Sequence, residues 1–125
     1  MARLTEPKDG EPIDAKALEQ QLFEAEQAAY DAPTRDKVAL AVLNEVHETL
    51  RAYTWTADKL SETALRIHSA MEELLRYLSK YGRADNSLGT LQASGPELDR
   101  LCGELACRRE ALTRMVRVAN ATLAD

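Results

Sequence analysis

The chain has 125 residues, of which 45% are hydrophobic and 30% charged, and its formal net charge is −5. This length predicts one domain, and the acidic balance argues against a general nucleic-acid-binding protein, which needs a basic surface to displace counterions. The longest uncharged apolar stretch is the short run 38–43, far below the roughly 20 residues that cross a bilayer. We therefore expect a cytoplasmic protein with no membrane segment.

The N-terminal part of the chain is polar and rich in residues that disfavour regular structure. Residues 1–12 contain Pro7, Gly10 and Pro12 among charged side chains. Such a composition predicts a flexible N-terminal tail, followed by a single helical domain over 13–125.

A first helix is expected over about 15–31. Asp14 stands where an N-cap is needed, and Pro33 follows the last apolar residues of the pattern. A cap before an apolar stripe and a proline after it are the usual signals for the two ends of a helix. Residues 1–31 hold three basic and eight acidic side chains, so they carry the whole net charge of the chain.

A much longer helix is expected over about 34–81. Thr34 can cap it and Gly82 can end it. From residue 43 onward its apolar residues recur at steps of three and four, as at positions a and d of a heptad repeat, which predicts a coiled-coil seam that needs partners. The part of this seam assigned to self-association is Leu50, Ala57, Leu60, Ala64, Ile67 and Met71.

The weakest point of the long helix is the segment 54–56, where two threonines flank a tryptophan. Two β-branched residues lower helix propensity, and a bend there would produce a compact four-helix monomer. The heptad phase continues across the segment without Gly, Asn or Pro, which favours one continuous helix.

A third helix is expected over about 95–123, after a loop over 82–94. Ser94, Pro96 and Glu97 resemble a capping box with proline in the first turn. Its apolar stripe is interrupted by Arg108 and Arg109, which belong with Arg114 and Arg117 to a basic cluster.

The predicted fold is all-α, with the long helix at the centre and the two shorter antiparallel helices end to end along it. Two helices side by side cannot enclose a core, so one side of the seam stays exposed. We expect dimerisation to complete a helical bundle.

No catalytic or metal-binding motif is present in the sequence. His47 and His68 are separated by three heptads, Cys102 and Cys107 lie on different helical faces, and neither pair has the spacing of a zinc site. We expect free thiols, no cofactor, no metal and no enzymatic activity.

The best candidates for partner contact are one tryptophan and the acidic side chains of the first helix. Trp55 falls on the outer face of the long helix between Arg51 and Lys59, and an outward tryptophan is typical of a binding anchor. Acidic side chains of the first helix can steer the encounter with a basic surface. These are Glu19, Glu24 and Glu26.

The sequence therefore favours a non-enzymatic protein–protein interaction module, such as an adaptor, regulator or inhibitor, that forms a homodimer. A special case is an acidic inhibitor from a phage or mobile element that blocks a nucleic-acid-handling complex, as anti-CRISPR proteins do. The alternatives are a small helical enzyme with Arg108 and Arg109 in a pocket, and a DNA-binding regulator that uses helix 95–123.

Overall fold

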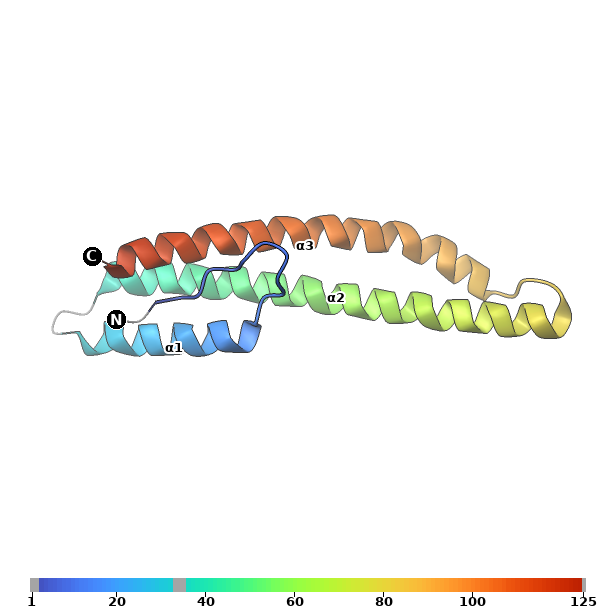
Figure 1. Cartoon of the computed structure of the whole chain (residues 1–125), viewed down its shortest axis with the longest axis horizontal. Helices are drawn as coiled ribbons and strands as arrows, with labels where there is room; N and C mark the ends of the chain where they lie inside the picture. Colours follow the sequence, from blue (N-terminus) through green and yellow to red (C-terminus); the bar gives the residue numbers. More distant parts are fainter. Residues whose placement is uncertain (1–2, 33–35, 125) are drawn as a thin grey trace. The chain divides into compact units, whose positions relative to one another are not determined.

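The computed structural model describes residues 3–32 and 36–124, and it contains three helices, α1 (Ala15–Asp31), α2 (Lys37–Tyr81) and α3 (Ser87–Ala124) (Figure 1). No strand occurs within those ranges, so the all-α prediction is confirmed. Contacts divide the chain into two compact units. Unit 1 holds the described residues up to Thr54 and those from Cys107 onward, and unit 2 holds 55–106.

Helix α1 has the bounds that its sequence predicted. The Asp14 Oδ1 atom accepts a hydrogen bond from the Ala17 amide at 3.1 Å, which confirms the predicted N-cap. The predicted stop signal, Pro33, lies outside the described residues. The buried side of the helix is its predicted apolar stripe, Leu18, Leu22, Ala25 and Ala29.

Helix α2 is continuous from Lys37 to Tyr81, so the alternative with a bend at 54–56 is wrong. The predicted cap Thr34 lies outside the described residues, and the cap observed is Asp36, whose Oδ1 accepts from the Ala39 amide at 3.0 Å. At the other end Gly82 adopts φ +69° and its amide donates to the Leu78 oxygen at 2.8 Å. This left-handed glycine after the last turn was predicted and is confirmed.

Helix α3 begins earlier than the sequence predicted. Asp85 accepts from both the backbone amide and the hydroxyl of Ser87, at 3.0 and 3.1 Å, and thereby starts the helix at that serine. The predicted loop over 82–94 and the start near 95 are therefore wrong. Pro96 lies inside the helix, and Ser94 is buried instead of capping. Packing of Ser94 and Leu101 explains why the helix passes through a proline that local propensity disfavours.

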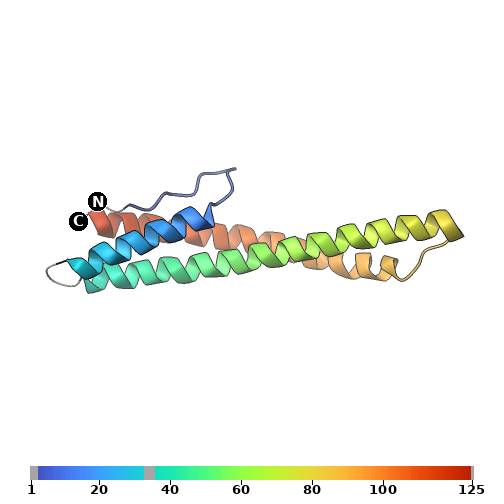
Figure 2. The same ribbon diagram turned by 90° about the horizontal axis from the view of Figure 1, so that it is seen from below.

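Unit 1 is built from three helices. In two views, α1, the first part of α2 and the last part of α3 lie side by side (Figures 1 and 2). The predicted end-to-end placement of the first and third helices is therefore wrong, because α3 is 38 residues long and its last turns pack with α1. The core of this unit consists of Leu4, Leu18, Leu22, Ala25, Leu43, Val46, Leu50, Leu112, Val116 and Ala119.

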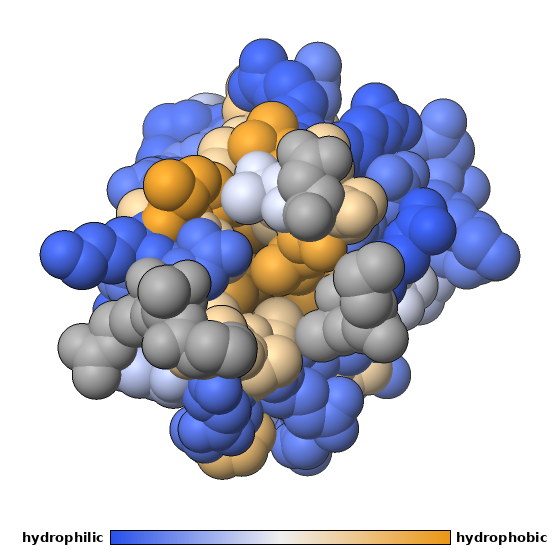
Figure 3. Space-filling view, turned by 90° about the vertical axis from the view of Figure 1, so that its left-hand side faces the viewer, coloured by the Kyte–Doolittle hydropathy of each residue, from blue (hydrophilic) through white to orange (hydrophobic). Residues whose placement is uncertain are grey.

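The N-terminal segment completes this core. Leu4 is 1% exposed, its amide donates to Asn120 Oδ1 and its oxygen accepts from Asn120 Nδ2, both at 2.8 Å. Thr5 forms a similar double contact with Gln21 of α1, again at 2.8 Å in each case. These contacts differ from the loosely held tail that composition predicted. Seen from its end, unit 1 shows hydrophobic side chains in the middle and hydrophilic ones around them (Figure 3).

Unit 2 contains two helices only, the later part of α2 and the earlier part of α3, joined by residues 82–86. The helices run antiparallel (Figure 2). That the chain forms one single domain stays a prediction.

Candidate protein-binding surface

The contact between α2 and α3 in unit 2 is made mostly by small side chains. Buried residues recur at exact heptad spacing on both helices, and most carry a hydroxyl or only a methyl group. Small side chains allow two helices to approach closely, but they bury little apolar area. The buried residues are Thr56, Thr63 and Ala70 on α2, and Ser87, Ser94 and Leu101 on α3.

Large apolar side chains of unit 2 remain at the surface. Met71 is 49% exposed and Leu75 is 62% exposed, and both lie on another side of α2 than the row of small residues. Ala64, Met71, Leu75 and Leu78 fall on one line of the helix because they are spaced by three, four or seven residues. We call this line the apolar face of α2. The neighbouring seam residues Leu60, Ile67 and Leu74 are half-buried.

In unit 1 the corresponding side of α2 is covered. Leu43 and Leu50, which are position a residues like Ala64, Met71 and Leu78, are buried against α1 and α3. His47, on the flank of this line, contacts Glu26 of α1 at 2.7 Å. His68 occupies the same heptad position in unit 2 and pairs with Glu72 of its own helix at 3.0 Å. The same pattern of residues therefore has a partner helix in unit 1 and none among the described residues of unit 2.

The predicted self-association seam is divided by this arrangement. Leu50 is 2% exposed in the core of unit 1, so it is not available to a second molecule. Ala57, Leu60 and Ile67 are half-buried, and Ala64 and Met71 are exposed. The accessible part of the seam belongs to unit 2.

Trp55 is 55% exposed, which excludes the possibility that another described helix covers it. The Lys59 ammonium lies 5.7 Å from the centre of the ring, at a distance where a cation–π contact forms. Arg51, predicted to flank the ring, pairs with Glu48 at 3.2 Å. An exposed indole ring with one cation at its side provides apolar area and a donor that a partner can use.

The three predicted acidic residues of α1 differ in their surroundings. Glu19 and Glu24 are exposed, and Glu24 accepts from Gln20 at 3.2 Å. Glu26 is half-buried and contacts His47. Of the three, only Glu19 and Glu24 are exposed, so the exposed acidic surface is smaller than the sequence predicted.

Two arginines of α3 contact the N-terminal segment. Arg109 donates to the Lys8 backbone oxygen, and Arg117 lies 3.5 Å from the Glu6 carboxylate. Arg108 is half-buried and also has a partner. Arg109 and Arg117 thus attach the segment around Glu6 and Lys8 to α3.

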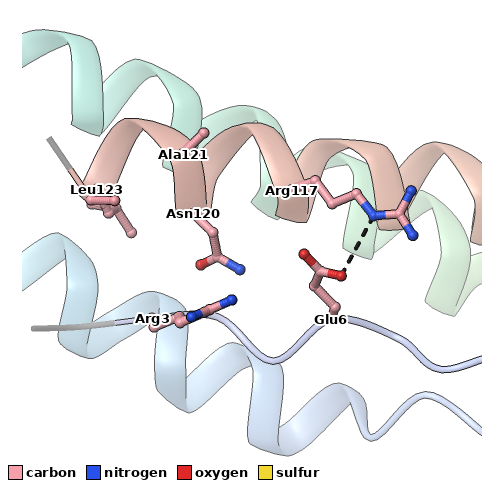
Figure 4. A pocket seen from close by; sticks show the side chains of 7 residues that line it. Arg3, Glu6, Arg117, Asn120, Ala121 and Leu123 are labelled. Atoms are coloured by element: carbon pink, nitrogen blue, oxygen red, sulfur yellow. Dashed lines mark hydrogen bonds and ion pairs between the residues drawn. The ribbon is translucent and has the colours of Figure 1, made fainter.

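A cavity of about 470 Å³ lies beside this segment (Figure 4). Asn120 and Arg117 project into it from α3, and Arg3 and Glu6 from the N-terminal segment. Arg117 pairs with the Glu6 carboxylate and Asn120 with the backbone of Leu4, so these three polar side chains of the cavity already serve the fold.

No group of three potential metal ligands occurs among the residues that the structure describes. His47 and His68 each contact one glutamate. Cys102 and Cys107 are free thiols, as predicted.

Comparisons with known proteins give no further guide, because no protein family, no curated protein and no solved structure matches the chain. Over the described part of the chain, none of the helices has the length and apolar character needed to cross a membrane.

Sequence reasoning missed part of this surface. Leu75 and Leu78 have the spacing of the apolar face and could have been included with Met71. On α3 the half-buried residues Leu91 and Leu98 lie seven apart, but the predicted loop over 82–94 hid that periodicity.

Proposed function

We propose that the protein is a non-enzymatic helical interaction module that acts by occupying a surface of another protein, and that it does so as a homodimer. The observation that carries this proposal is the unpartnered apolar face of α2 in unit 2. Monomeric proteins rarely expose contiguous apolar patches of this kind, and such patches usually mark interaction sites.

In this proposal two surfaces have separate roles, one in dimerisation and one in partner binding. The apolar face of α2 joins two copies, and Trp55 with Lys59 contacts the other protein. A half-exposed tryptophan contributes to binding when the partner covers it fully, since hot spots are enriched in this residue and lie in desolvated pockets. The proposed dimer presents two such rings, so it has two binding sites and can bind one partner bivalently.

Acidic residues of α1 act on the rate of encounter. Glu19 and Glu24 lie on a segment that carries the net charge of the chain, and charges of this kind steer a basic partner and are screened beyond about 8 Å at physiological salt. Reversal of both residues to lysine should slow association and flatten its salt dependence, with little effect on dissociation.

The test is a capture experiment from the source cell with three forms of the protein. The unaltered chain should retain a protein in stoichiometric amount, Trp55→Ala should lose it, and Val38→Ala should keep it. Val38 is also exposed on α2, so it controls for loss of any apolar surface residue. Retention of the protein by Trp55→Ala would contradict the role of the ring, and recovery of nucleic acid alone would favour a DNA-binding regulator.

A further inference from the structure

The N-terminal segment is held on unit 1 through its backbone. Asn120 of α3 accepts from the Leu4 amide and donates to the Leu4 oxygen, and Gln21 of α1 accepts from the amide of the next residue. Arg109 of α3 donates to the Lys8 oxygen. Every residue carries a backbone oxygen, and every residue except proline an amide, so contacts of this kind accept many sequences. Side chains of α1 and α3 thus form a site that can hold an extended peptide.

Leu4 is the apolar anchor of the segment. Its side chain is 1% exposed and belongs to the core cluster together with Leu22 of α1 and Val116 of α3. Residues 5–12 are exposed or half-buried. Backbone hydrogen bonds that supply affinity, and a pocket for one side chain that supplies specificity, are the usual features of peptide recognition. Leucine is therefore the residue that this site selects.

The charges of the segment match those of the site only in part. Glu6 lies 3.5 Å from Arg117. The Arg109 guanidinium, in contrast, donates to a neutral carbonyl, and the residue that provides this carbonyl is itself a lysine. A carboxylate is a stronger partner for a guanidinium than a neutral acceptor. A peptide with a carboxylate at the Lys8 position as well as at the Glu6 position therefore suits the two arginines better than the segment does.

The segment also leaves space on both sides. The cavity of about 470 Å³ in Figure 4 lies between the segment and α3, and a second cavity of about 320 Å³ lies between the segment and Leu18 and Gln21 of α1. Well-packed interiors contain few voids of this size, so the segment fills its site incompletely. In the first cavity Arg3 shares the lining with Leu123, and an apolar side chain at the Arg3 position would bury more apolar surface there.

The connection between the segment and α1 is an exposed turn. Residues 8–12 are all exposed, Gly10 has φ +78°, and the Glu11 amide donates to the Lys8 oxygen at 3.2 Å. Such a turn can change its conformation without breaking contacts of the core, because few buried groups depend on it. The segment can therefore leave the site while the helices of unit 1 stay folded.

We infer that the site of the N-terminal segment is a second binding site of the protein, for an extended acidic peptide of a partner protein, and that the segment is its built-in competitor. The peptide has an apolar residue and a leucine at the positions of Arg3 and Leu4, and carboxylates at those of Glu6 and Lys8. Displacement exchanges one buried leucine for another and adds an ion pair with α3. The site uses neither Trp55 nor the apolar face of α2, so it goes beyond the function proposed above.

The experiment measures the fluorescence anisotropy of labelled peptides titrated with the full-length chain. The probe has the sequence of residues 3–9 with Lys8→Glu. The chain is used unaltered and as Leu4→Asp, which detaches its own segment because a carboxylate is costly to bury in the core. The probe should bind the Leu4→Asp chain at least about tenfold more tightly than the unaltered chain, in which the segment competes. Equal binding to both chains would overturn the assignment of the site.

Two further peptides test what the site selects. The peptide that retains Lys8 should bind the Leu4→Asp chain several-fold more weakly than the probe, because it lacks the carboxylate for Arg109. The probe with Leu4→Asp should not bind measurably, because it lacks the anchor. Equal affinity of the peptides with Glu and Lys at position 8 would overturn the acidic preference, and binding of the peptide without leucine would overturn the anchor.

Two variants of the chain locate the peptide on α3. In the Leu4→Asp chain, Asn120→Ala should weaken binding of the probe several-fold, whereas Asn44→Ala, an exposed position on α2, should leave it unchanged. Circular dichroism checks that each chain is helical. If Leu4→Asp loses helix, Leu4→Ala detaches the segment more mildly and should still bind the probe more tightly than the unaltered chain. Failure of the probe to bind any folded form overturns the inference, while capture of a protein through Trp55 is tested separately and would still stand.

Discussion

Units 1 and 2 use the same helix in different ways. Unit 1 packs α2 against α1 and α3 around a core to which the N-terminal segment adds Leu4, and residues such as Leu43 and Val46 are fully buried there. Unit 2 pairs α2 with α3 alone, and Met71 and Leu75 remain at the surface. The heptad pattern is continuous across both, so the difference lies in the number of elements that the chain supplies to cover it. The same heptad seam can therefore be part of the hydrophobic core in one unit and an interaction surface in the other.

The largest expected effect comes from the same substitution made in each unit. Leu22→Ala removes a fully buried side chain of unit 1, whereas Leu75→Ala removes one that is 62% exposed. We expect Leu22→Ala to lower the free energy of unfolding by about 2–5 kcal/mol, and Leu75→Ala by much less in the monomer. Urea unfolding at low protein concentration measures both. Equal losses would contradict the difference in packing between the two units.

A smaller effect, of opposite sign, is expected from Pro96→Ala in unit 2. Proline inside a helix lacks the amide that would bond to the oxygen four residues earlier, and its ring crowds that turn. The substitution should raise the free energy of unfolding by about 1–3 kcal/mol, since the side chain is exposed and loses little packing. Thermal unfolding followed by circular dichroism tests this. A lower melting temperature would show that the proline is needed for the path of α3.

The next largest effect on the free energy of unfolding is expected when the N-terminal segment is detached from α3 in unit 1. Asn120→Ala removes both hydrogen bonds to the backbone of Leu4 and should cost about 1–2 kcal/mol. Asn44→Ala is the control, because Asn44 is exposed on α2. Hydrogen exchange at the Leu4 amide should also become faster in the Asn120 variant. An unchanged exchange rate would mean that this contact does not hold the segment.

The smallest effect on stability is expected at Trp55. Because its ring is more than half exposed, Trp55→Ala should change the melting temperature little while weakening partner binding by one to two orders of magnitude, as hot spots of about 2 kcal/mol do. Calorimetric melting and binding kinetics separate the two effects. A large loss of stability with intact binding would assign the ring to the fold.

The sequence identified α1 and α2 because their signals are local and agree with one another. Asp14 as a cap, Gly82 as a stop and an unbroken heptad all predict the observed helices. The sequence did not predict where α3 begins. Ser94 and Pro96 resemble a helix start, but α3 begins earlier, at the cap formed by Asp85, and packing of Leu101 keeps these two residues inside the helix. It also missed the burial of Leu4, because its contacts with Asn120 join residues far apart in the chain. The sequence predicted that an apolar seam of α2 would remain exposed. It wrongly included Leu50, which is buried in unit 1, because how far unit 1 extends along α2 depends on where α3 ends.

The most direct measurement of the central claim is hydrogen exchange along α2 at several protein concentrations. The claim is that a second copy covers in unit 2 the side of α2 that α1 covers in unit 1. Exchange of amides over 57–81 should slow as the concentration rises, because dimerisation stabilises the structure that contains them, while amides over 39–50 should change much less. Concentration-independent exchange over 57–81 would contradict the claim, and the face would then have no second copy upon it.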